Sequence, residues 1–217
     1  ISVGNARDLD LKDIQQAVDG FLGQVRQIPP MYSAIKRQGK PLYKLARQGI
    51  NIEREARIIQ IYRYQILNFT KSSIPTLDVD ISCSKGTYIR ALADELGSML
   101  GCGAHVSSLD RYSAGPFHER DAISLSDLEK KSESENRGSL NALLHSVDAG
   151  ILDFPKINLN ALQIRAFTYG QSVLLPNCFI TGQEADIVRV FDHNQNFIGV
   201  AQITSDNSIK PKRLIAN

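Results

Sequence analysis

An alternating strand runs into an amphipathic helix through a short turn near the middle of the chain. Residues 77–84 alternate apolar and polar side chains, which predicts a strand with one buried face. Residues 87–100 carry apolar side chains at helical spacing, and Gly101 follows them, which predicts a helix that ends there. A chain with this pattern must pack a sheet against a helix. The apolar side of the strand is formed by Leu77, Val79, Ile81 and Cys83.

The turn between this strand and this helix reads Ser-Lys-Gly-Thr-Tyr-Ile-Arg over residues 84–90. Free backbone N–H groups at a helix start attract anions, and Lys85 adds positive charge. Tyr88 supplies an aromatic ring, so the junction suits a planar, anionic ligand such as a nucleotide. A nucleotide-binding enzyme that uses Lys85 and Thr87 as a phosphate loop is an alternative. The glycine spacing argues against it, because such a loop needs a glycine five residues before its Gly-Lys-Ser/Thr.

The composition is that of an ordinary globular chain. Its 217 residues allow one large domain or two small ones, and 42% are hydrophobic and 22% charged. No apolar run approaches the roughly 18 residues of a membrane span, and no secretory signal pattern is found. The three cysteines form no paired framework and the four histidines are scattered, so we expect a reducing cytoplasm and no metal site. The first residue is Ile1, which suggests a fragment or a processed product.

Positive charge is concentrated in one part of the chain. Between Arg26 and Arg63 there are nine basic residues and two acidic ones, Glu53 and Glu55, whereas acids exceed bases in the remainder. A local basic surface on a chain of net charge +2 favours binding to a polyanion. A solvated lysine-rich surface without a partner is an equally acceptable interpretation of the charge alone.

Several further elements are predicted by pattern and by turn residues. Helices are expected at 11–22 and 41–48, and Ser126 and Glu129 could form a capping box for a third. Strands are expected at 57–68 and 104–111. From about residue 154 onward short strands alternate with turns, including a hairpin of 187–191 with 197–203 and a last strand at 209–215, as in a small separate β-barrel.

Three blocks carry a resemblance to a known family. Residues 28–49 contain Pro-Pro-Met-Tyr-Ser-Ala followed by Lys36, Gly39 and Tyr43. Residues 83–90 read Cys-Ser-Lys-Gly-Thr-Tyr-Ile-Arg, and residues 101–111 read Gly-Cys-Gly-Ala-His-Val-Ser-Ser-Leu-Asp-Arg. Together these blocks resemble the TruB family of tRNA pseudouridine synthases. The resemblance runs from about Leu11 to the C-terminus.

The resemblance implies a fold and a division into domains. The fold class would be α+β, with a mixed, largely antiparallel sheet of the pseudouridine synthase type and flanking helices. Residues 1–152 would be the C-terminal part of the catalytic domain, with an insertion called the thumb at about 26–50. Residues 153–217 would form a small PUA-like β-barrel that binds RNA.

The resemblance also implies an activity and the residues that carry it. The family isomerises the uridine at position 55, in the T-loop of tRNA, by flipping the base, breaking the glycosidic bond and rejoining the base through carbon, without metal or organic cofactor. Tyr88 would stack on the flipped base, and its hydroxyl is also placed to move a proton; Arg90 would pair with the nucleophilic aspartate; and Leu109 would line the base pocket. The residues expected to contact RNA are Lys36, Arg37, Lys40, Arg47, Lys85 and Arg111.

Two departures from the family pattern matter. Asp110 stands where the family usually has a cation, which puts RNA contact at that point in question. The nucleophile motif, Gly-Arg-Leu-Asp-Pro or similar, does not occur in the 217 residues. Asp8 and Asp10 lack the following proline, and we interpret them as helix-start residues.

The full enzyme is therefore expected to contain an additional N-terminal segment with the aspartate, and this chain alone is expected to be inactive. The expected partners are that segment and the T-stem-loop of tRNA; the protein would be a cytoplasmic monomer without membrane contact. A non-catalytic RNA-binding or RNA-folding protein is the alternative for a chain without the aspartate.

Overall fold

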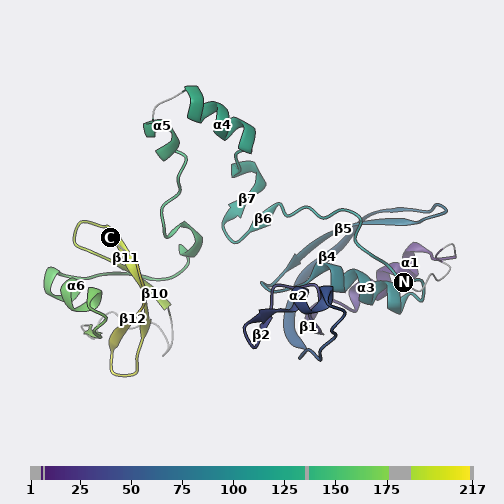
Figure 1. Ribbon diagram of the computed structural model, residues 1–217, viewed down its shortest axis with the longest axis horizontal. Helices are drawn as coiled ribbons and strands as arrows, with labels where there is room; N and C mark the ends of the chain where they lie inside the picture. Colours follow the sequence, from purple (N-terminus) through teal and green to yellow (C-terminus); the bar gives the residue numbers. More distant parts are fainter. Residues whose placement is uncertain (1–5, 7, 135–136, 176–186, 216–217) are drawn as a thin grey trace. The chain divides into compact units, whose positions relative to one another are not determined.

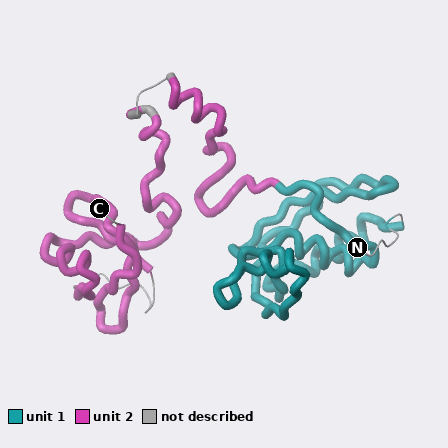
Figure 2. The backbone as a smooth tube through the Cα atoms, in the orientation of Figure 1, with its two compact units in different colours: residues 1–109 teal, residues 110–217 magenta. Residues whose placement is uncertain are grey.

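The chain divides into two compact units in a computed structural model, residues 1–109 and residues 110–217 (Figure 2). The structure describes residue 6 and residues 8–134, 137–175 and 187–215. Both units contain helices and strands, so the chain is α+β, as predicted (Figure 1). The predicted domain boundary after residue 152 is a different division of the chain and stays a prediction.

The first unit is built on a three-stranded antiparallel sheet. Its strands are β1 (Gly23–Gln27), β4 (Arg57–Thr70) and β5 (Thr76–Cys83), in the order β1-β4-β5. The long strand at 57–68 and the alternating strand at 77–84 are thereby confirmed within two residues at each end. The register of β4 on β5 shifts twice, between Ile61 and Arg63 and between Ile66 and Asn68. Such bulges bend a strand and increase its twist.

Two helices pack on this sheet and supply its core. They are α1 (Leu11–Asp19) and α3 (Ile89–Met99). Ile14, Val18 and Leu92 are at most 1% exposed and lie in one cluster with Ile59 and Ile61 of β4. The predicted helix at 11–22 ends three residues early, because residues 20–22 form a turn, in which the Phe21 and Leu22 N–H groups donate to the Val18 and Asp19 carbonyls, before Gly23 begins β1. The predicted helix at 87–100 begins two residues late, because residues 84–87 form the turn.

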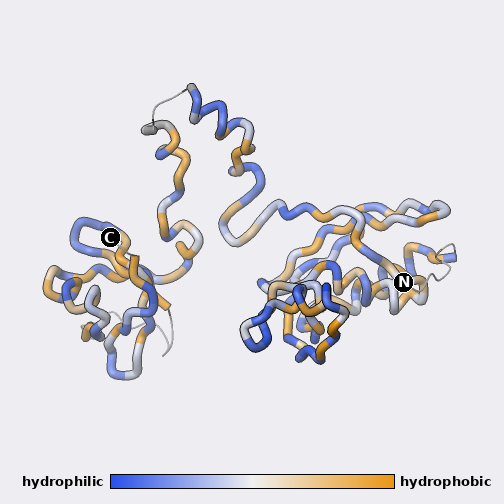
Figure 3. Tube along the Cα trace, viewed as in Figure 1, coloured by the Kyte–Doolittle hydropathy of each residue, from blue (hydrophilic) through white to orange (hydrophobic). Residues whose placement is uncertain are grey.

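The segment between β1 and β4 covers the residues at which the thumb insertion was predicted, and that assignment stays a prediction. It contains the two-residue strands β2 (Lys36–Arg37) and β3 (Lys40–Pro41), and the helix α2 (Leu42–Arg47). Gln38 and Gly39 join the strands with φ values of 49° and 78°, as a tight hairpin turn requires. The hairpin is hydrophilic (Figure 3), and Leu42 anchors the segment with 2% exposure.

The second unit begins with short elements. They are β6 (Ser113–Ala114), β7 (Phe117–His118), a 3₁₀ turn (Glu119–Asp121), α4 (Leu125–Ser134), α5 (Arg137–Asn141) and a second 3₁₀ turn (Ala149–Ile151). The predicted capping box from Ser126 to Glu129 is wrong. The Ser124 hydroxyl instead accepts from the Asp127 N–H at 3.1 Å, so the helix begins two residues earlier.

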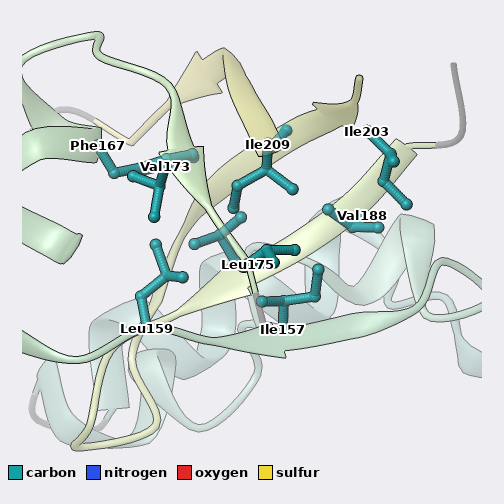
Figure 4. Packing of buried hydrophobic residues seen from close by; sticks show 10 residues of the cluster. Ile157, Leu159, Phe167, Val173, Leu175, Val188, Ile203 and Ile209 are labelled. Carbon is teal, nitrogen blue, oxygen red and sulfur yellow. The ribbon is translucent and has the colours of Figure 1, made fainter. Parts of the chain in front are cut away.

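A curled five-stranded sheet completes the second unit. Its strands are β8 (Lys156–Asn158), β9 (Val173–Leu174), β10 (Ile187–Phe191), β11 (Phe197–Ile203) and β12 (Ser208–Leu214), in the order β8-β10-β11-β12-β9. The predicted hairpin of 187–191 with 197–203 is confirmed, and all described pairs except β8 with β10 are antiparallel. The helix α6 (Ala161–Thr168) lies between β8 and β9 in sequence and buries Phe167 completely. Figure 4 shows apolar side chains of this sheet, of α6 and of adjoining residues gathered in one cluster.

Candidate functional site

The turn between β5 and α3 is held by hydrogen bonds to β4 and by one within the turn. The Ser84 N–H donates to the Gln60 carbonyl at 2.8 Å, and the Ser84 hydroxyl accepts from the Gln60 N–H at 2.9 Å. The Thr87 hydroxyl donates back to the Ser84 carbonyl at 2.9 Å. Gly86 has a φ of 85°, which favours glycine. These bonds leave Lys85 exposed at the tip of the turn and deliver the chain to Tyr88 in a defined position.

Tyr88 stands at the first position before α3. It is half-buried, with φ −102° and ψ 103°, and its own side chain makes no capping hydrogen bond. Its N–H donates to the Oε1 atom of Gln27 at 2.8 Å, and its carbonyl accepts from the Nε2 atom of the same side chain at 3.2 Å. The end of β1 therefore holds the backbone from which the Tyr88 ring projects.

Arg90 connects the same helix start to the segment that follows β1. Its side chain is exposed, and its Nη2 atom donates to the Tyr32 carbonyl at 2.9 Å. The next residue, Ser33, is 5% exposed, and its hydroxyl has no hydrogen-bond partner in the described structure. The structure thus brings Tyr88 and Arg90 together with the base of the insertion.

The basic residues of the insertion differ in how they are held. Lys36 and Lys40 are exposed on the β2–β3 hairpin. The Arg37 guanidinium donates to the Glu53 carbonyl, and the Arg47 guanidinium lies 5.5 Å from the centre of the Tyr43 ring. Arg37 and Lys40 also border a pocket of about 430 Å³ with Leu45 and Ile52. The insertion is a cationic surface on a small apolar support, which suits phosphate groups.

Family models match almost the whole chain. Residues 2–89 match the TruB family pseudouridylate synthase N-terminal domain, residues 90–151 the tRNA pseudouridylate synthase B C-terminal domain, and residues 155–215 the pseudouridine synthase II TruB C-terminal domain. The tRNA pseudouridine synthase B of Saccharophagus degradans is 41% identical over 212 residues, which are 98% of this chain and 68% of that protein. That of Actinobacillus pleuropneumoniae is 42% identical over 99% of this chain and 67% of its own length. The chain belongs to the TruB family of pseudouridine synthases.

Solved structures agree with the family at the level of the fold. A Cbf5–Nop10–Gar1 complex superposes with a TM-score of 0.71 at 22% identity, over 95% of this chain and 62% of the other. An H/ACA ribonucleoprotein bound to a substrate RNA that contains 2′-deoxyuridine gives a TM-score of 0.69 at 19% identity, over 97% and 62%. The TruB-family chain spans about two thirds of the length of the relatives and structures it matches.

The third block of TruB resemblance forms a loop, and the strand predicted at 104–111 is wrong. The Cys102 and Gly103 N–H groups donate to the Gly97 carbonyl at 3.1 and 2.9 Å, which turns the chain back against α3. A strand needs a ladder partner, and in the described residues β5 is paired only with β4. Leu109 lies in this loop and is 58% exposed. Arg111 is exposed and belongs to the second unit, so it is not placed relative to Tyr88.

The two aspartates near the start of the TruB-family chain have different settings. Asp10 caps α1: its Oδ1 atom accepts from the Asp13 N–H at 2.8 Å, which confirms the helix-start interpretation for this residue. That backbone hydrogen bond lowers the pKa of Asp10. Asp8 is exposed in a turn just before α1.

Gln27 and Ser33 are site residues that the sequence patterns did not single out. Hydropathy patterns treat glutamine and serine as surface residues, yet Gln27 is 1% exposed. The only available signal was their position, on either side of Pro29 and Pro30.

The described residues contain no group of three His, Cys, Asp or Glu side chains that could hold a metal ion. None of the helices in this part of the chain is long and apolar enough to cross a membrane.

Proposed function

We propose that this chain is the thumb, base-holding and C-terminal part of an enzyme that converts the T-loop uridine at position 55 of tRNA to pseudouridine. The observation that carries the proposal is the junction at the start of α3. There, Tyr88 and Arg90 are both hydrogen-bonded to the segment that leads into the cationic thumb. The names of the bacterial relatives support tRNA as the substrate. We place the reaction in the cytoplasm and expect a monomer.

The proposed roles follow from the chemistry of the isomerisation. The bond from C1′ of the ribose to N1 of uracil breaks, a bond from C1′ to C5 forms, and a proton leaves C5 and another is taken up at N1. A base in a helical stack cannot turn over, so it must be flipped out and held. The half-buried Tyr88 ring offers a stacking surface, its hydroxyl is a candidate for the proton transfer, and Leu109 is proposed to line the base pocket.

Arg90 is proposed to hold an attacking carboxylate in its ionised form. A guanidinium close to a carboxylate favours the charged state and so favours nucleophilic attack. The carboxylate itself is proposed to come from a segment with a Gly-Arg-Leu-Asp-Pro-like motif outside these 217 residues. In that case the chain alone binds RNA and does not turn it over.

The cationic residues are proposed to hold the T-stem-loop by its phosphates. Lys36, Lys40 and Lys85 are exposed and can reach a backbone without breaking internal hydrogen bonds. Arg37 and Arg47 first have to share or leave the Glu53 carbonyl and the Tyr43 ring. Arg111 is proposed as a further phosphate contact. Phosphate contacts of this kind supply affinity and little sequence choice.

The test uses a protein that joins this chain to a segment bearing the nucleophile motif. A T-stem-loop RNA is incubated with it, and pseudouridine is detected by chemical derivatisation, because the isomerisation does not change the mass. Conversion at position 55, and none in an RNA with cytidine at that position, supports the proposal. A folded protein that binds the RNA and converts no uridine contradicts it.

A further inference from the structure

Gln27 is the most deeply buried polar side chain in the part of the chain that the structure describes. It ends β1 with 1% of its surface exposed. Both ends of its amide are used on one residue: Oε1 accepts from the Tyr88 N–H at 2.8 Å and Nε2 donates to the Tyr88 carbonyl at 3.2 Å. A buried glutamine that satisfies both backbone groups of one other residue acts as a bracket for that residue.

The bracket lies where the helix start has no cap of its own. The Tyr88 carbonyl already accepts from the Ala91 and Leu92 N–H groups, at 3.0 and 3.2 Å, so Gln27 strengthens an acceptor that is in use. The Tyr88 side chain makes no capping hydrogen bond, and the N–H of this half-buried residue is satisfied by the Gln27 amide. Without the Gln27 amide, the Tyr88 N–H would lose this partner, while its carbonyl would still be held by α3. The φ angle of Tyr88 could then change, and with it the direction of the ring.

A second link joins the same two segments five residues further along the chain. The Arg90 guanidinium donates to the Tyr32 carbonyl at 2.9 Å. Between Gln27 and Tyr32 lie Pro29 and Pro30, whose rings restrict φ and make the connection stiff. The segment from Gln27 to Tyr32 is therefore a short strut, fixed at both ends to the start of α3, and it continues directly into the thumb.

We propose that Gln27 is a positioning residue, which fixes the Tyr88 ring in the orientation that receives the flipped base and ties that orientation to the base of the thumb. Gln27 acts through the backbone of Tyr88 and does not touch the substrate. The inference rests on the proposed function for its effect on turnover. Its structural part, the orientation of the Tyr88 ring, can be measured without any catalysis.

The first measurement uses Gln27→Met in the protein with a complete active site. Methionine has nearly the same length and shape but makes neither hydrogen bond, so the core stays filled while the bracket is removed. We expect kcat to fall at least about tenfold, which corresponds to about 1.4 kcal/mol in the activation barrier, with KM for the T-stem-loop changed by less than about threefold. KM is expected to hold because the thumb cations are untouched.

The matched control is Gln24→Met, an exposed glutamine on the same strand. It should leave both kinetic constants unchanged. Gln27→Asn keeps the amide but withdraws it by one methylene, so it should reduce kcat in the same direction, and it serves if Gln27→Met does not fold. Wild-type kcat in a folded Gln27→Met protein, assayed well below its unfolding temperature, overturns the proposal.

The second measurement uses the 217-residue chain labelled with 3-fluorotyrosine. The ¹⁹F resonance of Tyr88 is assigned by its disappearance in Tyr88→Phe. We expect Gln27→Met to shift or broaden this resonance, and Gln24→Met to leave it in place. An unchanged Tyr88 resonance in Gln27→Met overturns the inference even if turnover is abolished. If the wild-type protein with a complete active site makes no pseudouridine, the proposed function fails. The comparison of the Tyr88 ¹⁹F resonance between wild type and Gln27→Met then still tests whether Gln27 holds Tyr88.

Discussion

The two hydrophobic clusters in the described residues differ in how many of their side chains remain partly exposed. In the cluster formed by the C-terminal sheet and α6, Phe167, Val190 and Ala201 are fully buried, and three partly exposed side chains of the described residues pack at its border. The cluster of residues 1–109 also has a buried centre. However, the partly exposed side chains that pack against this centre are at least as numerous as the buried ones. The partly exposed ones include Leu77, Val79 and Ile81, along the apolar side of β5.

This difference indicates that the C-terminal cluster mainly stabilises the fold, whereas the cluster of residues 1–109 lies beneath a surface that can bind a partner. A fully buried core is stabilised by packing among its own side chains. A substitution at one closely packed position is therefore expected to destabilise the whole sheet. The cluster of residues 1–109 includes Ile89, next to Tyr88, and its partly exposed members are accessible to a partner. Variants in the C-terminal sheet should therefore change stability, whereas variants in the first unit should change binding and turnover as well.

Gly199→Ala should have the largest effect on stability alone. Gly199 has a φ of 155°, and a Cβ atom there would lie 2.2 Å from the Arg213 carbonyl oxygen of the neighbouring strand β12. Neither backbone can move without breaking the register, so we expect a loss of about 3 kcal/mol. Hydrogen exchange should locate the loss in β11 and β12, with protection of β4 and β5 unchanged. Gly150→Ala, where the Cβ atom would meet only the Phe117 ring at 3.6 Å, is the control.

Gly97→Ala should combine loss of stability with loss of the site. A Cβ atom on this buried residue of α3 would lie 2.0 Å from the Ala104 nitrogen and 2.3 Å from the Gly103 carbonyl carbon. The loop that leads to Leu109 must then move away, at a cost of about 2–3 kcal/mol. We expect weaker RNA binding as well as a lower unfolding temperature. Ser98→Ala, at the adjacent exposed position, should change neither. Normal binding by Gly97→Ala would show that the loop is not part of the site.

The sequence predicted those elements whose periodicity and bounding turns both lie within one local segment. The alternation of residues 77–84 predicted β5, and the spacing of the last hairpin predicted β10 and β11, because each pattern contains both its periodicity and its turn. The position of Tyr88 and Arg90 at the start of α3 followed from the same pattern.

Features that depend on contacts distant in sequence could not be predicted in this way. The expected strand at 104–111 has strand-like residues but no ladder partner, and its path is set by the close approach of Gly97 to Ala104. The α4 cap could not be chosen between Ser124 and Ser126, since both precede an acidic residue at the right spacing. The Gln27 bracket spans 61 residues, and a hydropathy pattern does not distinguish such a glutamine from a solvated one.

Tyr88→Ala should weaken RNA binding without affecting the C-terminal sheet. Loss of a stacking platform for one base costs about 1–3 kcal/mol in binding. Tyr88→Phe keeps the ring and should keep most of this binding, and it should lower turnover only if the hydroxyl moves a proton. Titration with a T-stem-loop RNA measures the first effect and single-turnover kinetics the second. Unimpaired activity of Tyr88→Ala would mean that the ring has only a packing role.

Lys40→Ala should have a smaller effect, visible mainly in the salt dependence. Lys40 is exposed on the thumb hairpin, and removing its bond to one phosphate should lower the slope of log affinity against log salt by about 0.7–0.9. Lys36→Ala should do the same, whereas Lys210→Ala, on β12 of the C-terminal sheet, tests whether that sheet also binds the RNA. An unchanged slope in both thumb variants would leave the thumb as a solvated surface.

Asp10→Ala should have the smallest effect, and one that depends on pH. The Asp13 N–H holds the carboxylate at the start of α1 and lowers the pKa of Asp10, so the charged cap stabilises the fold above the unfolded-state pKa of about 3.9. This stabilisation disappears as the pH falls through the lower, folded-state pKa. Asp10→Asn keeps a neutral cap. At pH 7 the unfolding temperatures should follow wild type, then Asn, then Ala, and the difference between wild type and Asn should shrink towards pH 3. If the unfolding temperature of Asp10→Ala equals that of wild type at pH 7, the N-terminal cap does not stabilise α1. The packing of Ile14 and Val18 in the cluster of residues 1–109 would then be sufficient to hold this helix.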